Sequence, residues 1–173
     1  MPARTSSACA RRAGRPTARA LRHTLTHILP YRPEQMLDLV GDVEAYPQFV
    51  PWIVALRTWN AHAAADGAQV VDAEAQVGFS FLREKFATRV RRDAAAGTVS
   101  VDLLYGPFRR LHNVWMFLEH PSGTEVNFLI DFEFKSRLLD NLLAANMHRA
   151  VDKLVACFEA RAEALYGPRT QTA

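Results

Sequence analysis

The sequence has few cysteines and no long apolar runs. Only two cysteines occur in 173 residues, and no apolar run exceeds five residues, as at Trp52–Leu56 and Val114–Leu118. A helix that crosses a bilayer needs about 18 apolar residues, so we expect none in this sequence. Cys9 and Cys157 fall in a polar leader and a distant helical pattern, so we expect no structural disulfide and reducing surroundings.

Acidic residues are missing from the first 33 positions, which hold seven arginines. The other 140 residues carry 14 of the 21 basic side chains and all 18 acidic ones, a net charge of −4. This mildly acidic part argues against DNA as a partner. We predict a disordered basic extension over residues 1–22, a domain over 23–166 and a tail over 167–173. An organelle transit peptide and an upstream start codon both remain alternatives for the extension.

Catalytic and metal-binding patterns are also missing. His23 and His27 would share one face of a strand, but the neighbourhood lacks further metal ligands. No serine stands in a nucleophile-elbow context, and no glycine-rich phosphate loop occurs. We therefore expect a protein that is not an enzyme, with no catalytic residues, no metal and no catalytic cofactor.

The hydrophobic pattern predicts an α+β domain. Residues 23–29 suit a first strand, and Pro33 begins a short helix that ends near Gly41. Residues 42–52 hold two prolines among large apolar residues, which predicts a short helical turn or loop. Six alternating segments then predict consecutive antiparallel strands. They cover approximately residues 54–58, 71–79, 86–91, 99–105, 111–117 and 126–134.

The last segment has helical periodicity, which predicts one long amphipathic helix from near Ser136 to Tyr166. Because this helix is the only element long enough to cover the sheet, we expect a curved sheet wrapped around it. The inward aromatic side chains either fill a core or line an internal hydrophobic cavity, and the pattern alone leaves both open.

Two motifs resemble the coenzyme Q-binding START-domain family. They are the stretch from Ile28 through Pro33 to the Val43-Glu44-Ala45-Tyr46-Pro47 turn, and Gly106-Pro107-Phe108 followed by Leu111, Trp115 and Phe117. The resemblance covers about residues 23–166. It implies a START-like helix-grip fold with a hydrophobic tunnel that binds ubiquinone and supports respiratory electron transport and quinone biosynthesis. One branch of the family is named for a ribosome-association toxin that acts on the large ribosomal subunit and inhibits translation initiation, and related helix-grip proteins are polyketide cyclases. Both stay as alternatives.

A quinone site needs apolar walls and a few polar groups. The predicted walls are Phe79, Phe86, Val101, Leu103, Tyr105, Trp115, Phe117, Phe128, Ile130, Phe132, Leu142, Leu143, Met147 and Val151. The predicted entrance loop comprises Tyr46, Pro47, Phe49, Pro51 and Trp52, which could equally be a packing plug. Tyr105, Asn113 and His148 are candidate polar partners of the ligand.

Basic residues recur on one strand, where alternation places Lys85, Arg89 and Arg91 on the outer face. We expect this patch to contact either anionic lipid headgroups or the ribosome, the alternative being an ordinary solvated strand face. An isoprenoid quinone is the expected bound ligand. The expected location is the cytoplasm or the surface of the inner membrane in a bacterium, or the mitochondrial inner membrane in a eukaryote.

Overall fold

A computed structural model describes residues 21–79, 82–144 and 146–167, without the side chains of residues 79, 82, 142–144 and 147. The predicted extension and C-terminal tail therefore lie almost wholly outside the described residues. The elements, in chain order, are β1 Leu21–Leu29, α1 Pro33–Gly41, the 3-10 turn η1 Val43–Ala45, α2 Tyr46–Phe49, β2 Ile53–Ala63, β3 Gln69–Phe79, β4 Leu82–Asp93, β5 Thr98–Tyr105, β6 Phe108–His120, β7 Gly123–Phe134, α3 Arg137–Ala144 and α4 Met147–Tyr166.

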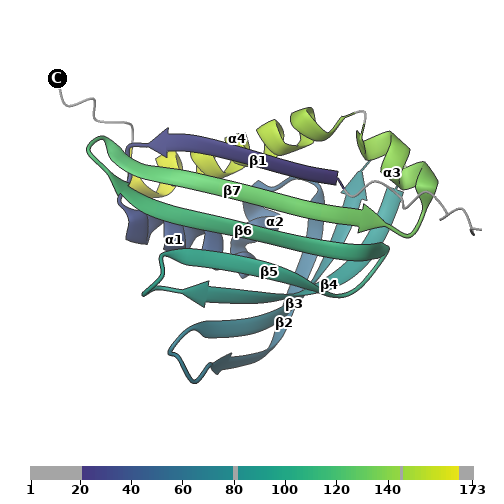
Figure 1. Cartoon of the computed structure of the whole chain (residues 1–173), viewed down its shortest axis with the longest axis horizontal. Helices are drawn as coiled ribbons and strands as arrows, with labels where there is room; N and C mark the ends of the chain where they lie inside the picture. Colours follow the sequence, from purple (N-terminus) through teal and green to yellow (C-terminus); the bar gives the residue numbers. More distant parts are fainter. Residues whose placement is uncertain (1–20, 80–81, 145, 168–173) are drawn as a thin grey trace, which may run out of the picture.

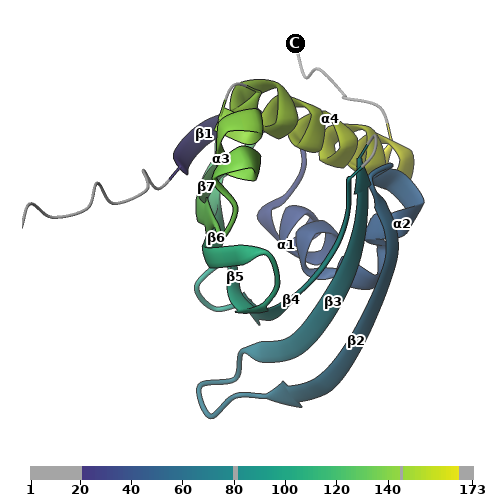
Figure 2. The ribbon, with the colours of Figure 1, turned by 90° about the vertical axis from the view of Figure 1, so that its right-hand side faces the viewer.

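The seven strands form one antiparallel sheet in the order β1-β7-β6-β5-β4-β3-β2. The sheet curves strongly, with α1 in its concave side and α4 crossing the open side between the two sheet edges (Figures 1 and 2). This confirms the predicted α+β helix-grip fold. The first strand closes the sheet at the edge opposite β2 by pairing with the last strand.

A proline and two hydrogen bonds determine where α1 begins. Pro33 opens α1, where its fixed φ is suited to the first turn and its missing N–H costs nothing. Gln35 accepts a hydrogen bond from the backbone N–H of Arg32 at 2.9 Å, which caps that turn. Thr124 is fully buried and donates to the carbonyl of Tyr31 at 2.5 Å, so β7 holds the chain where it enters α1.

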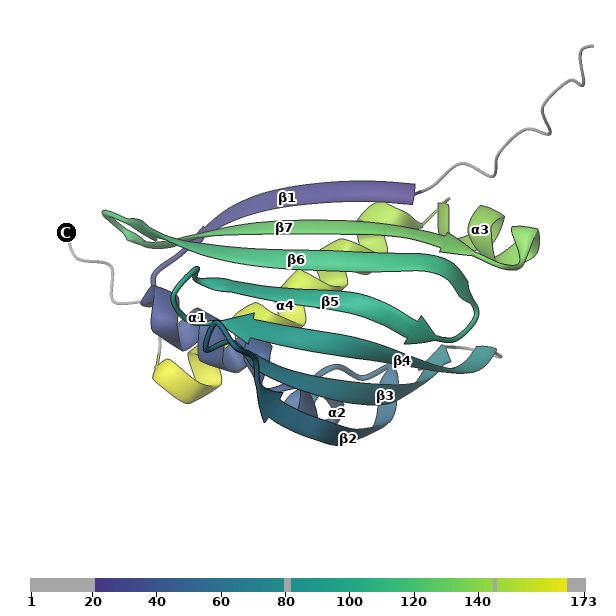
Figure 3. The ribbon, with the colours of Figure 1, turned by 60° about the horizontal axis from the view of Figure 1, so that its bottom comes forward.

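The C-terminal helix differs from the prediction of one continuous helix. It is divided into α3 and α4, with a turn at Asn146. Asn146 has φ −125° and ψ 8°, outside helical geometry, and asparagine favours helix ends over helix interiors. As a result α3 lies at the end of the sheet opposite α1, while α4 runs diagonally behind the sheet (Figure 3).

Candidate ligand-binding site

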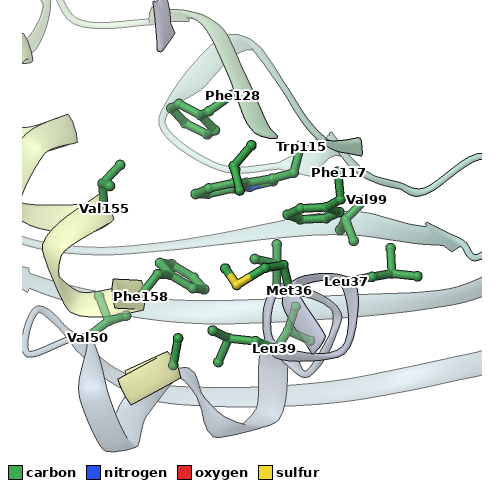
Figure 4. Close-up of a cluster of buried hydrophobic side chains, with 14 of the residues drawn as sticks. Met36, Leu37, Leu39, Val50, Val99, Trp115, Phe117, Phe128, Val155 and Phe158 are labelled. Atoms are coloured by element: carbon green, nitrogen blue, oxygen red, sulfur yellow. The ribbon is translucent and has the colours of Figure 1, made fainter. Parts of the chain in front are cut away.

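The half of the concave face nearest α1 is closely packed. The ring of Trp115 on the sheet packs against Phe128 and against Phe158 of α4, and Met36 of α1 is 1% exposed among them (Figure 4). One hollow here holds about 10 Å³, roughly the room for a single water molecule. It is lined by Leu25, His27, Leu29, Met36, Trp115, Val126, Phe128, Val155, Phe158 and Glu159. A drug-sized ligand needs some hundreds of Å³, so this hollow is not its site.

The predicted wall residues divide into four groups. Those buried in the core are Trp115, Phe117, Phe128, Phe132 and Val151. Those that are half-buried are Phe86, Val101, Leu103 and Ile130. The side chains of Phe79, Leu142, Leu143 and Met147 lie outside the described residues. Tyr105 is the exception, because it lies on the other face of the sheet.

Tyr105 points outward, so its predicted inward position is wrong. β4 pairs Thr88 with Leu103 but Ala87 with Tyr105, so Leu104 is an extra residue in β5 that reverses the alternation beyond it. The Tyr105 side chain is 47% exposed, and its hydroxyl donates to Glu74 on the outer face. This hydrogen bond, assisted by Arg57, holds the pKa of the Glu74 carboxyl below its ordinary value.

The predicted entrance loop is anchored to the core. Tyr46 and Phe49 both meet the ring of Phe158 edge-on, at centroid distances of 5.2 and 5.1 Å. The Tyr46 hydroxyl donates to the carbonyl of Val40 at 2.6 Å, and burial raises the pKa of that phenol. These contacts give the loop the packing role that the sequence left open, while Pro51 is exposed and Trp52 half-buried. Its role as an entrance stays a prediction.

A second part of the concave face is only partly covered. Its residues occupy neighbouring inward positions on the adjacent strands β5, β6 and β7 and are half-buried, although four of the five are apolar. We call this set the half-open band: Val101, Leu103, Leu111, Asn113 and Ile130. Next to it, Phe132 and Phe134 are buried under Phe108, which stacks on Phe134 at 4.5 Å. The half-open band is therefore a partly covered apolar part of the inner face, beside the closed core.

Two polar side chains lie in line with this band. His23 on β1 and Asn113 on β6 are both paired in register with Ile130 on β7, so all three share the inner face. The ring of His148 on α4 meets His23 edge-on at 5.0 Å. The candidate His148 thus lies against His23, and the candidate Asn113 lies two strands away on the same face. His23 was not among the predicted polar candidates, although its inward position could be read from the alternation of the first strand.

The predicted basic strand does face outward, but two of its three charges are balanced. Arg89 binds the buried carboxylate of Asp72 through two hydrogen bonds of 2.8 and 3.0 Å. Arg91 binds Asp66 at 2.5 Å and Asp93 at 3.3 Å. Lys85 is exposed near the start of β4. Surface pairs of this kind leave little free positive charge, so the expected contact with lipid or ribosome stays a prediction with weak electrostatic support.

The described part of the chain shows little that suits metal or thiol chemistry. The described residues contain no group of three or more histidine, cysteine or acidic side chains that could hold a metal. Cys157 is a free, half-buried cysteine on α4, and burial raises the pKa of its thiol, which makes the thiolate scarcer. None of the described helices combines the length and apolar character that a membrane span requires.

Comparison with known proteins places the chain. Residues 29–159 match the family described as polyketide cyclase / dehydrase and lipid transport. The chain belongs to this family. Among curated members, the ribosome association toxin RatA of Rickettsia prowazekii is 36% identical over 141 residues, which cover 80% of this chain and 93% of that protein. The mitochondrial coenzyme Q-binding protein COQ10 homolog B of Xenopus laevis is 28% identical over 154 residues, covering 87% of this chain and 61% of that protein.

Two solved structures share the fold. An 18 kDa protein from Caulobacter crescentus is 60% identical, with a TM-score of 0.72 and coverage of 86% of this chain and 99% of that chain. The Zhui aromatase/cyclase from Streptomyces is 17% identical with a TM-score of 0.66, covering 84% of this chain and 93% of that chain. At this identity the cyclase supports the fold alone.

Proposed function

We propose that this protein is a non-enzymatic carrier that binds an isoprenoid quinone of the ubiquinone class on its inner face. The observation that carries the proposal is the half-open band. Leaving apolar area in contact with water costs about 25 cal/mol per Å², so a ligand that covers the band gains that free energy on binding. A polyisoprenoid tail is long and apolar, which suits such a surface.

The names of the relatives favour a quinone over other apolar ligands. The family description includes lipid transport, and a relative that aligns with 87% of this chain is named for coenzyme Q binding. A quinone headgroup needs only one or two polar partners within an apolar site, and the inner face offers Asn113 together with His23. Delivery of the quinone to the respiratory chain or to quinone-modifying enzymes would be the biological use of such binding.

Tryptophan fluorescence tests the proposal, because Trp115 lies two residues from Asn113 on the same face of β6, about 7 Å away along the strand. A quinone in contact range quenches an excited indole. We therefore expect a Trp52→Phe/Trp59→Phe protein to show saturable quenching by a ubiquinone with two isoprene units. An absence of saturable quenching would contradict quinone binding at this site.

A matched pair of variants locates the binding. Leu103→Gln places a polar group in the half-open band, and we expect it to weaken ubiquinone binding by about tenfold through lost apolar contact. The control is Leu104→Gln, because Leu104 is 40% exposed and lies outside the inner-face alternation at the bulge. Equal loss in both variants would argue against the inner face as the site.

Ribosome association is the second candidate. It is supported by the relative named ribosome association toxin, which matches 36% of the aligned residues. The ion-paired arginines of β4 give it no strong electrostatic surface on that strand. Co-sedimentation with isolated large ribosomal subunits at physiological salt separates the two candidates, since a quinone carrier should stay in the supernatant.

A further inference from the structure

Two buried polar atoms on the inner face lack the partners that burial demands. In the described part of the chain, His23 Nε2 and Asn113 Oδ1 are both buried without a hydrogen-bond partner. The other such atoms are the Nε groups of Arg92 and Arg161, whose Nη2 groups already bind Asp38 and Gln48. An unpaired buried polar group costs about 1–3 kcal/mol, so each native example calls for an explanation.

The sheet register sets these two atoms on opposite sides of one apolar residue. His23 and Asn113 flank Ile130 on adjacent strands, so their backbones are roughly 10 Å apart, or two strand spacings. Both side chains rise from the same face of the sheet. A small ring that lies over Ile130 would therefore have one polar group at each side, with Val101 and Leu111 of the half-open band as further apolar contacts.

The hydrogen-bonding chemistry of the pair matches both redox forms of a quinone. The imidazole of His23 donates or accepts at Nε2 according to its tautomer, and the Asn113 amide donates or accepts according to its flip. The oxygens of a quinone only accept, whereas the hydroxyls of a quinol also donate. The pair can satisfy either form without a change in protein charge.

His148 holds the His23 ring from the helix side. Its own side chain is exposed at the beginning of α4, and its ring meets His23 edge-on at 5.0 Å. It therefore acts as a positioning residue that fixes the plane of the His23 ring.

We propose that His23 and Asn113 form a headgroup site, in which they hydrogen-bond the two opposite oxygens of a quinone or quinol ring lying over Ile130. This inference rests on the proposed function and adds the orientation of the ligand. It predicts that the headgroup lies between β1 and β6 and that the tail follows the half-open band toward Leu103.

The test uses the Trp52→Phe/Trp59→Phe protein with the two-isoprene ubiquinone as a quenching probe and farnesene, a headgroup-free isoprenoid, as competitor. Each lost hydrogen bond should weaken quinone binding by up to about tenfold. We expect Asn113→Leu and His23→Leu each to weaken ubiquinone binding and to leave competition by farnesene at its original concentration. His148→Leu should produce a smaller loss in the same direction.

Stability separates a ligand contact from a structural polar group. Because Asn113→Leu removes an unpaired buried oxygen, the variant should unfold at the same or a higher urea concentration than its parent. Asn127→Leu is the control, because Asn127 lies on the outer face of β7 and bonds Glu125 at 2.8 Å. That control should lose stability and keep full quinone affinity.

The results that would overturn the headgroup site differ from those that would overturn quinone binding itself. Unchanged ubiquinone affinity in Asn113→Leu and His23→Leu would overturn the headgroup site while leaving quinone binding in place. A reduced affinity accompanied by early urea unfolding in Asn113→Leu would also overturn it, because that pattern indicates a structural role. An absence of quenching in the parent protein would overturn the proposed function and the headgroup site together.

Discussion

At the scale of single residues, the buried polar groups are of two kinds. Some are fully hydrogen-bonded within the protein, and others have no hydrogen-bond partner. Asp72 is 4% exposed yet fully bonded, accepting from Arg89 and from Asn60 at 2.9 Å. Asn113 and His23 are also fixed in position by the sheet register, but each has a buried atom without a hydrogen-bond partner. The first pattern stabilises the folded chain, whereas the second is the observation from which we infer a headgroup site.

The Asp72 interaction predicts a pH-dependent loss of stability in Asp72→Asn. The Arg89 hydrogen bonds, aided by Asn60, hold the pKa of Asp72 below its ordinary value, so its stabilisation is present above the unfolded pKa and is lost as pH falls through the folded one. We expect the variant to lose about 1–2 kcal/mol at neutral pH, discounted for the half-exposed arginine. The difference in unfolding free energy between the parent and the variant should disappear only at acidic pH, below the ordinary pKa of an aspartate.

Urea unfolding across a pH series measures this gap. Asp152→Asn on the exposed side of α4 serves as the control and should not change stability. A gap that stayed constant down to strongly acidic pH would contradict the assigned role of Asp72.

Residue positions were predictable where strict alternation holds. The period of two places Asn113 and Ile130 inward, and the structure confirms both. It fails at Tyr105, because the extra residue Leu104 leaves no mark in the sequence that distinguishes it from an ordinary strand position. The missing partners of Asn113 were beyond prediction, since they depend on what β1 and α4 bring to the same place.

At the scale of elements, the strands and the first helix follow from period and turn residues. The break between α3 and α4 does not, because the apolar positions continue at three and four through Asn146, and a single asparagine does not end a helix by rule. The packing role of α2 could be predicted only in part from the sequence. Its prolines exclude regular structure, but its contact with Phe158 depends on a residue more than a hundred positions away.

The β5–β6 turn provides a prediction at this scale. Gly106 has φ +148°, and a Cβ there would stand 2.4 Å from the Cβ and 3.0 Å from the Cα of Phe86. Gly106→Ala should therefore cost about 2–4 kcal/mol, through backbone strain and displacement of the neighbouring strand. Thermal unfolding measures the loss.

Gly67→Ala is the matched control for that turn. Gly67 also has a positive φ, +88°, but nothing lies within 4 Å of its Cβ position. It should lose only the conformational cost, about 1–2 kcal/mol. Equal losses in the two variants would contradict the steric account of the turn.

At the scale of the whole molecule, the structure shows where the apolar side chains and the charges lie. The apolar side chains divide between a closed core around Trp115 and Phe158 and a half-open band on the same concave face. The charges of Arg89, Arg91 and Arg92 on β4 are matched by neighbouring carboxylates. Composition predicted a core and period predicted the fold, but neither shows which part of an inner face is left uncovered, because that depends on where α1 and α4 lie against the sheet.

The most direct test of quinone binding is an organic extract of the purified full chain, analysed by mass spectrometry and ultraviolet absorbance. We expect an isoprenoid quinone at close to one molecule per chain in the unsubstituted protein, and markedly less in Leu103→Gln than in Leu104→Gln. An unsubstituted protein that carries no quinone, and that sediments with large ribosomal subunits at physiological salt, would contradict quinone binding.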